Sequence, residues 1–165
     1  MAAQYAFGKE FPSLFAIARK AAPGDKKMKQ GNETVLLVDD DQAILCVGVE
    51  ILERLGYRMF SASEGNEAIE VYRANRDIID IIILDMVMPG MDGEETFRAL
   101  KSINSNVAVV LSSGYSIQGK AMEIMKEGAD DFIQKPFSMT QLSDKIRDVM
   151  DSREVEGKKD KGIRG

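Results

Sequence analysis

The chain has 165 residues, a formal net charge of −5, one cysteine and no histidine. That length fits one domain with short extensions, and the missing histidine excludes a Ser-His-Asp triad, a His-ligated zinc site and a phosphohistidine relay within the chain. The lone cysteine excludes an internal disulfide, no apolar run approaches the ~20 residues that span a bilayer, and no secretory signal is evident, so we expect a cytoplasmic protein.

Residues 1–32 form a predicted leader. Apolar residues recur at three- and four-residue spacing, which predicts an amphipathic helix of about three turns after Pro12, followed by a linker. The residues that carry this pattern are Phe11, Leu14, Phe15, Ala18 and Ala21. Two interpretations stay open, a helix that packs on a partner and a remnant of a larger protein. The basic stretch at 26–29 is interpreted as a solvated linker and not as a nucleic-acid patch.

Residues 33–150 alternate short apolar runs with longer segments of helical period, the pattern of βα units around a parallel sheet. The predicted strands lie at about 35–38, 58–62, 79–84, 107–111 and 131–134. The predicted helices lie at about 43–55, 66–75, 94–101, 118–127 and 139–150. The central strands lack an alternation of apolar and polar residues, so we expect helices on both faces of the sheet.

Single residues mark the ends of these predicted helices. Gly56 and Gly128 are predicted to end helices, and Asp41 and Ser138 to cap the starts of others. Cys46 falls within the first helix of this region, where we expect a small buried side chain.

The C-terminal stretch and the charge distribution bound the function further. Residues 151–165 are polar and contain three glycines, which predicts a disordered tail. Between Glu33 and Met150 the chain holds eleven basic and twenty-one acidic residues. An acidic domain argues against direct nucleic-acid binding, because that binding needs a basic surface that displaces counterions.

Carboxylates follow two of the predicted strands. Right-handed βα crossovers place the carboxyl ends of parallel strands along one edge, so polar residues after different strands meet there. Neighbouring carboxylates repel by about 4 kcal/mol per pair at ~4 Å, and Mg²⁺, which prefers oxygen ligands and accepts phosphoryl oxygens, relieves that repulsion. The pattern therefore predicts a metal-assisted phosphoryl site. The residues expected at this edge are Asp39, Asp40, Asp41, Asp85, Ser112, Ser113 and Lys135.

Four segments in this order and spacing, VLLVDDD, LDMVMPGMDG, LSSGYS and DDFIQKPF, resemble the receiver (CheY-like) domains of two-component response regulators. The resemblance covers residues 34–150, with the receiver domain at 33–150, and implies a doubly wound five-stranded parallel sheet in the order 2-1-3-4-5. It implies that Asp85 accepts a phosphoryl group from the phosphohistidine of a partner sensor histidine kinase or from a small phosphodonor. It also implies a signalling domain that promotes its own phosphorylation and dephosphorylation, and not an enzyme.

The resemblance assigns the metal site. Asp40 would be a direct Mg²⁺ ligand, Asp39 would hold the metal or a metal-bound water, and Asp85 and the main-chain carbonyl of Val87 would complete the protein ligands. Asp41 is expected to act as a helix cap instead.

The resemblance also assigns a switch. Ser113 and Lys135 would each contact a phosphoryl oxygen after modification, and the ring of Phe132 would turn inward as Ser113 moves. The bond between Lys135 and Pro136 would be cis. Ser112 is the competing hydroxyl, but Gly114 follows Ser113 where the family has a small residue, which favours Ser113.

Two positions depart from the acidic or amide residues often found in receivers. Val87 stands two residues after Asp85, and Tyr115 stands two after Ser113. Both would flank the path of an attacking water with apolar or aromatic surface, so we predict that they slow self-dephosphorylation.

The partners implied by the resemblance are proteins. A face at about 118–150 would change its docking to a downstream partner or its self-dimerisation on phosphorylation. The segment QGNETVLLVDDD resembles receivers attached behind hybrid sensor kinases, so an excised domain and a free-standing regulator both stay open.

Two other classes share parts of this pattern. A haloacid-dehalogenase-like phosphohydrolase would use Asp39 as the nucleophile of the motif Asp39-x-Asp41, but Ala43 stands where that family has Thr or Val, and Asp85 would go unused. A flavodoxin-like cofactor binder would need a hydroxyl- or glycine-rich phosphate loop after the first strand, where three aspartates stand instead.

Overall fold

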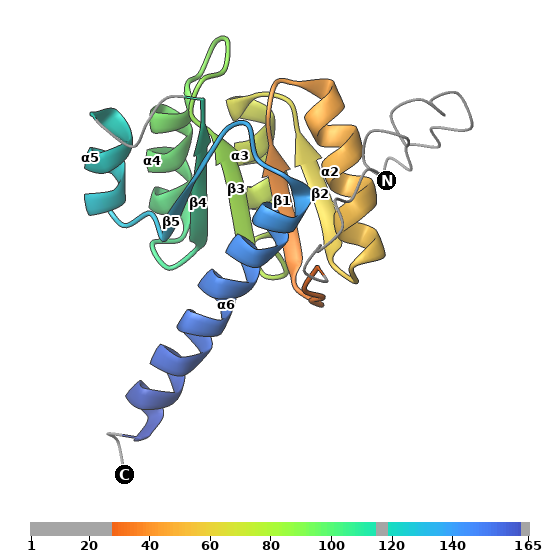
Figure 1. Ribbon diagram of the computed structural model, residues 1–165. Helices are drawn as coiled ribbons and strands as arrows, with labels where there is room; N and C mark the ends of the chain where they lie inside the picture. The colour runs from red at the N-terminus through yellow and green to blue at the C-terminus, as the bar shows by residue number, and fades with distance from the viewer. Residues whose placement is uncertain (1–27, 115–118, 163–165) are drawn as a thin grey trace.

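The computed structural model describes residues 28–114 and 119–162 as five strands and five helices in alternation (Figure 1). The strands are β1 (Thr34–Val38), β2 (Arg58–Ala62), β3 (Ile81–Asp85), β4 (Ala108–Ser113) and β5 (Asp131–Gln134). The helices are α2 (Gln42–Arg54), α3 (Gly65–Asn75), α4 (Gly93–Ile103), α5 (Lys120–Lys126) and α6 (Met139–Gly162). The predicted alternation of strand and helix is confirmed.

The strands form one parallel sheet in the order β2-β1-β3-β4-β5, which confirms the predicted order. The helices cover both faces of this sheet: α2 and α6 pack on one face, and α3, α4 and α5 on the other (Figure 1). All strand carboxyl ends therefore lie at one edge.

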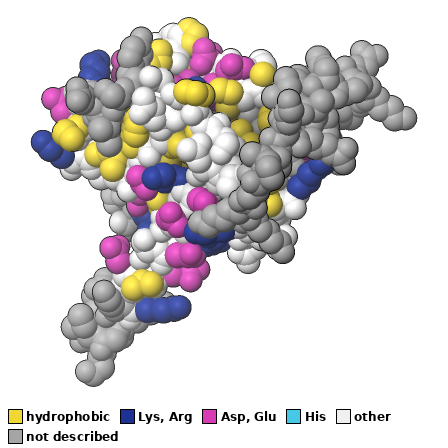
Figure 2. Space-filling view, in the orientation of Figure 1, with side chains coloured by type: hydrophobic (Ala, Val, Ile, Leu, Met, Phe, Trp, Pro, Cys, Tyr) yellow, Lys and Arg dark blue, Asp and Glu magenta, His cyan; other side chains and the backbone are white. Residues whose placement is uncertain are grey.

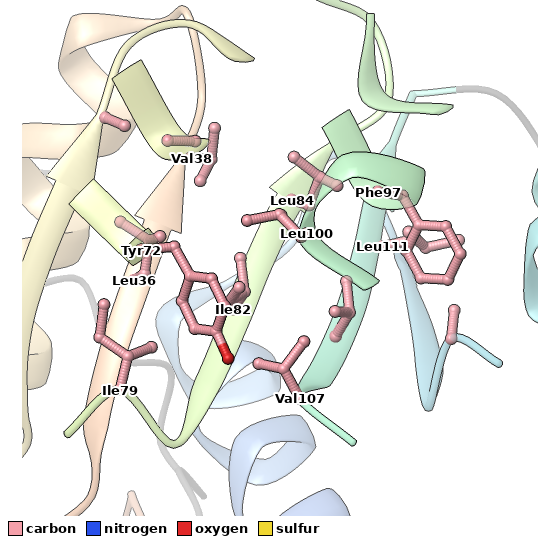
Figure 3. Packing of buried hydrophobic residues seen from close by; sticks show 14 of the residues in the cluster. Leu36, Val38, Tyr72, Ile79, Ile82, Leu84, Phe97, Leu100, Val107 and Leu111 are labelled. Atoms are coloured by element: carbon pink, nitrogen blue, oxygen red, sulfur yellow. The ribbon is translucent and has the colours of Figure 1, made fainter. Parts of the chain in front are cut away.

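Two buried clusters, one on each face, form the core. On one face Tyr72 of α3 lies beside Leu36 and Ile82, and Phe97 of α4 lies beside Leu111 (Figure 3). On the other face α2 and α6 contribute Leu45, Leu52, Leu142, Ile146 and Val149. Because β1, β3 and β4 are buried on both faces, every position in them is closed to solvent, which explains their continuous apolar runs.

Local sequence fixes the helix ends. The carboxylate of Asp41 accepts from the backbone N–H of Ala43 at 2.8 Å, so the predicted cap of α2 is confirmed. Ser138 and Gln141 exchange hydrogen bonds at the start of α6, which confirms the cap predicted there. Gly56 and Gly128 have φ of 99° and 110°, the left-handed conformation that glycine adopts at little cost.

Two strand boundaries differ from the prediction by two residues, and the others by one residue or none. The β3 strand begins at Ile81 and not at residue 79, because the backbone N–H of Ile79 still bonds to Asn75 at the end of α3. The β4 strand continues to Ser113, because the backbone N–H of Lys135 bonds to the carbonyl of Ser113 at 2.8 Å.

The prediction of a disordered tail is wrong for residues 151–162, which continue α6 beyond the body of the domain (Figure 1). No proline interrupts this stretch, and Arg147 pairs with Asp151 one turn later at 3.0 Å. Arg153 also binds the carboxylate of Asp130 at 2.6 Å and donates to the carbonyl of Asn106. These contacts hold the extension against two loops, and acidic and basic side chains lie side by side along it (Figure 2).

Residues 28–33, here called the N-terminal strap, lie against α6 and the end of α2. The hydroxyl of Ser143 donates to the carbonyl of Lys29 at 2.7 Å, and Gly31 donates to the carbonyl of Leu55 at 3.1 Å. Arg147 binds Glu33 at 2.6 Å, with both side chains nearly buried. The strap thus fastens the chain before β1 to α6.

Three further expectations concern Cys46, the leader helix and Tyr115. Cys46 is exposed, so its predicted burial is wrong: α2 turns Leu45, Gly48 and Leu52 towards the sheet instead. The predicted leader helix and Tyr115 lie outside the described residues. Within the described residues, no helix is both long and apolar enough to cross a membrane.

Candidate functional site

The predicted convergence of acidic residues at the sheet edge is confirmed. Asp39 directly follows β1 and Asp85 ends β3, and these strands are paired with Val38 opposite Leu84, so the two carboxylates stand next to each other. Both residues are almost closed to solvent, at 2% and 3% exposure, whereas Asp40 is exposed. The edge holds an open depression lined by Asp39, Asp40, Asp41, Asp85, Val87, Gly114 and Lys135.

Lys135 supplies the cation that these buried carboxylates need. Its ammonium lies 2.6 Å from a carboxylate oxygen of Asp39 and 3.2 Å from one of Asp85. Burial lowers the pKa of Lys135, but the hydrogen bond that its ammonium donates to Asp39 and the charges of both aspartates outweigh burial and raise that pKa overall. Lys135 is therefore a firmly charged ammonium between two carboxylates.

Asp85 is the perturbed carboxylate of this site. Burial raises its pKa to about 6, and the negative charge of Asp39 adds to the rise. The backbone N–H of Val87, which donates to Asp85 at 3.1 Å, and the ammonium of Lys135 act in the opposite direction. Because burial prevails over these two contacts, Asp85 is protonated more easily than an exposed aspartate. With a pKa of about 6 it is still largely ionised at pH 7.5.

Backbone groups fix both carboxylates. Asp39 accepts from the backbone N–H of Asp41 at 2.9 Å, which leaves its other oxygen to Lys135. Gly93 lies directly below the end of β3, where an added Cβ would stand 2.5 Å from the carbonyl oxygen of Asp85. The loop after β3 can therefore return close to the site only because residue 93 is glycine.

The acidic residues offer a ligand set suited to a hard divalent cation. Asp39, Asp40 and Asp85 each present one carboxylate oxygen, and these oxygens lie within 4.8 Å of one another. Opposite ligands of an octahedral Mg²⁺ are about 4.2 Å apart, from a metal–oxygen distance of ~2.1 Å, so this spacing fits the ion after a small contraction. Asp40 faces solvent, which leaves room for bound water.

Of the predicted switch residues, Lys135 lines this depression, Ser113 precedes a lining residue and Phe132 lies in β5. Ser113 is buried at the end of β4, immediately before Gly114 of the depression. Phe132 is partly buried and packs on the core of the α3–α4–α5 face, to which Leu111, two residues before Ser113, also belongs. The peptide bond between Lys135 and Pro136 is cis, as the resemblance implied. The side chain of Val87 is 55% exposed beside Asp85.

Sequence reasoning missed three features of the site. It predicted that Lys135 forms its charge contact only after modification, but the ammonium already pairs with Asp39 and Asp85. Two neighbouring carboxylates with no other cation in the sequence pattern could have indicated this pairing. It treated Val87 as a side chain and carbonyl and overlooked its N–H. It also set aside Ser112, which is strand-paired with Asp85.

The chain matches known proteins over this same region. The response regulator receiver domain family matches residues 35–147. The chain is 32% identical to the sensor kinase CckA of Brucella abortus over 75% of its own length and 13% of that protein. It is also 32% identical to the sporulation initiation phosphotransferase F of Bacillus subtilis, over 70% of its own length and 92% of that protein.

A solved structure agrees with these relatives. The complex of CheX and CheY with BeF3 and Mg from Borrelia burgdorferi contains a chain that matches with a TM-score of 0.68 and 27% identity, over 72% of this chain and 89% of that one. The chain thus spans nearly all of the small relatives and only a small part of the kinase.

Proposed function

The chain belongs to the response regulator receiver domain family, and from this membership we propose that Asp85 is its phosphoacceptor. Receiver domains act in two-component signalling, so the proposed donor is the phosphohistidine of a sensor histidine kinase, or a small acyl phosphate in its place. The observation that carries the proposal is the pairing of a buried Asp85 with Asp39 and Lys135 at an open edge of the sheet.

The proposed reaction is a direct displacement at phosphorus. A carboxylate oxygen of Asp85 forms a bond to phosphorus while the bond from phosphorus to the donor nitrogen, or to the acyl oxygen of acetyl phosphate, breaks. The leaving imidazole or acetate keeps the electron pair of that bond. No general base is needed, because with a pKa of about 6 the carboxyl of Asp85 is already mostly ionised at pH 7.5.

Asp39, Asp40 and Asp85, with the main-chain carbonyl of Val87, are the proposed holders of Mg²⁺. The ion would supply neutralisation of the carboxylates and of the charge on the phosphoryl oxygens. The residues themselves orient the reaction. Asp39 and Lys135 fix each other, and the N–H of Val87 holds one oxygen of Asp85 while the other oxygen lies 3.2 Å from the ammonium of Lys135.

Ser113, Lys135 and Phe132 are the proposed switch. Ser113 and Lys135 would contact phosphoryl oxygens once Asp85 is modified, and Phe132 would follow Ser113 into the core of the α3–α4–α5 face, against which it already packs. Residues 118–150 are the proposed face for a downstream protein or a second copy. Val87 and Tyr115 are proposed to slow hydrolysis of the acyl phosphate.

The phosphohydrolase alternative loses its basis in the site. Its nucleophile would be Asp39, which is buried and bound to Lys135, and its second aspartate would be Asp41, which caps α2. Asp85, the carboxylate with the raised pKa, would have no role in that reaction.

Acetyl phosphate tests the proposal directly. The protein is incubated with acetyl phosphate and Mg²⁺, and any acyl phosphate is trapped and located by mass spectrometry. We expect a Mg²⁺-dependent adduct at Asp85 that Asp85→Asn abolishes and Asp77→Asn retains, since the side chain of Asp77 is 93% exposed. An adduct at Asp39, or turnover without an adduct at Asp85, would refute it.

A further inference from the structure

Ser112 stands in the same row as the two buried aspartates. Asp85 is opposite Ser112 in the β3–β4 ladder, and Val38 opposite Leu84 puts Asp39 next to Asp85. Side chains alternate between the faces of a strand. Leu37, Ile83 and Val110, each two residues earlier, belong to the core of the α2–α6 face, so Asp39, Asp85 and Ser112 all turn towards that face.

The hydroxyl of Ser112 has no hydrogen-bond partner within the described part of the chain. The residue is 2% exposed and its Oγ atom is closed to solvent. Buried hydroxyls are nearly always paired, because water can no longer bond to them, so an unpaired one at a polar site calls for an explanation. Alanine would fill the same space without the penalty.

The side chain of Lys135 has to cross the strand ends on its way to Asp39. Its backbone N–H bonds to Ser113 in β4, yet its ammonium reaches Asp39 after β1. The sheet order β1-β3-β4-β5 therefore requires the side chain to cross the carboxyl ends of β4 and β3, over Ser112 and Asp85. An ammonium has three N–H groups, and the two aspartates account for two of them.

Phosphorylation would alter these contacts, and here the inference rests on the proposed function. When Asp85 forms a bond to phosphorus, its carboxylate loses its charge and becomes a weaker acceptor for Lys135. The ammonium then turns towards the new phosphoryl oxygens, and the N–H group that pointed at Asp85 needs another acceptor from the protein.

We propose that Ser112 is a positioning residue of the site, whose hydroxyl oxygen accepts a hydrogen bond from Lys135 once Asp85 carries a phosphoryl group. An unpaired hydroxyl disfavours the unmodified protein and a paired one favours the modified protein. Ser112 therefore shifts the equilibrium towards the phosphorylated arrangement while acting through Lys135.

Beryllofluoride in the presence of Mg²⁺ measures this shift at equilibrium, because it occupies the place of a phosphoryl group on a carboxylate. The affinity is measured by calorimetric titration of the full chain. For Ser112→Ala we expect binding about three- to tenfold weaker, with a thermal midpoint of the unliganded protein that is equal or higher. Ser112→Thr, which keeps the hydroxyl, is expected to retain the affinity.

Thr34→Val is the matched control. Thr34 is also buried in a central strand with an unpaired hydroxyl, but it lies at the opposite end of β1. We expect its affinity for beryllofluoride to equal that of the wild type. If Ser112→Ala does not fold, Ser112→Cys removes the hydroxyl with less change in size and is held to the same expectation.

The outcomes separate the two proposals. Wild-type binding that Asp85→Asn abolishes, combined with unchanged binding by Ser112→Ala, would overturn the role of Ser112 alone. Weaker binding together with a lower thermal midpoint, not rescued by Ser112→Thr, would identify a merely structural residue. Wild-type protein that does not bind beryllofluoride would overturn the phosphoacceptor proposal and this inference together.

Discussion

Replacing Asp85 with asparagine should stabilise the metal-free protein at neutral pH. Burial raises the pKa of Asp85 to about 6 in the folded protein, above its ordinary value of 3.8. The ionised carboxylate is therefore less favourable in the folded than in the unfolded chain. The penalty is absent below pH ~4, grows as pH rises through the folded pKa, and is complete above pH ~7.

The size of the effect follows from those two values. Their difference corresponds to about 3 kcal/mol, at 1.36 kcal/mol for each pH unit. Because the carboxylate stands at an open depression, solvent screens part of this penalty, and the figure is an upper bound. We expect Asp85→Asn to raise the free energy of unfolding by up to ~3 kcal/mol at pH 7.5, and by almost nothing near pH 4.

Urea unfolding in the presence of EDTA at pH 4, 6 and 7.5 measures this difference. Asp77→Asn is the control, since the side chain of Asp77 is 93% exposed and its removal should leave the pH profile unchanged. An Asp85→Asn protein no more stable than the wild type at pH 7.5 would refute the reasoning, and so would a stability gap that does not shrink towards pH 4.

Three further perturbations test other contacts. Glu33→Gln should lower the free energy of unfolding by about 1.5–3 kcal/mol at pH 7. Burial raises the pKa of Glu33, but the contact with Arg147 outweighs burial and lowers that pKa overall. The stabilisation is therefore present above pH ~4.5 and is lost as pH falls through the lower folded pKa. Urea unfolding at pH 7 and 3.5 would contradict this if the gap stayed constant. Arg153→Ala should speed amide exchange after residue 153 and leave the sheet amides unchanged. Arg54→Ala, which removes an exposed pair with Glu50 on α2, should not speed exchange after residue 153. Equal exchange in both variants would argue against an anchored extension. Val87→Asn should shorten the acyl-phosphate lifetime several-fold, because an amide beside Asp85 can orient water where an exposed apolar side chain now stands; an unchanged decay rate would show that Val87 does not tune the lifetime.

The sheet could be predicted because its determinants are local. Runs such as IIIL (residues 81–84) lack alternation, and only a strand buried on both faces accommodates them. Parallel topology then predicts that Asp39, Asp85 and Lys135 lie at one edge, without reference to individual contacts. The strand ends were less predictable, since Ser113 joins β4 through a bond to Lys135, twenty-two residues later.

The misplaced elements depend on contacts between distant residues. The stretch after Met150 is polar and contains glycine, so its composition indicates disorder. Arg153 nevertheless binds Asp130, which lies in the loop between α5 and β5. Residues 28–32 of the strap fall within the predicted leader, although Ser143 of α6 donates to the carbonyl of Lys29. No local pattern encodes such pairs.

β1 and α6 are joined at both ends, and this determines how the site can act on the rest of the domain. At the site, Lys135 in the lead-in to α6 binds Asp39 after β1 at 2.6 Å. At the opposite end, Arg147 of α6 binds Glu33 before β1, also at 2.6 Å. A phosphoryl group that draws Lys135 away from Asp39 weakens the first contact and leaves the second intact. We therefore expect α6 to tilt about Arg147 and not to slide along the sheet, so that a small movement at the site is passed to the helical extension beyond it.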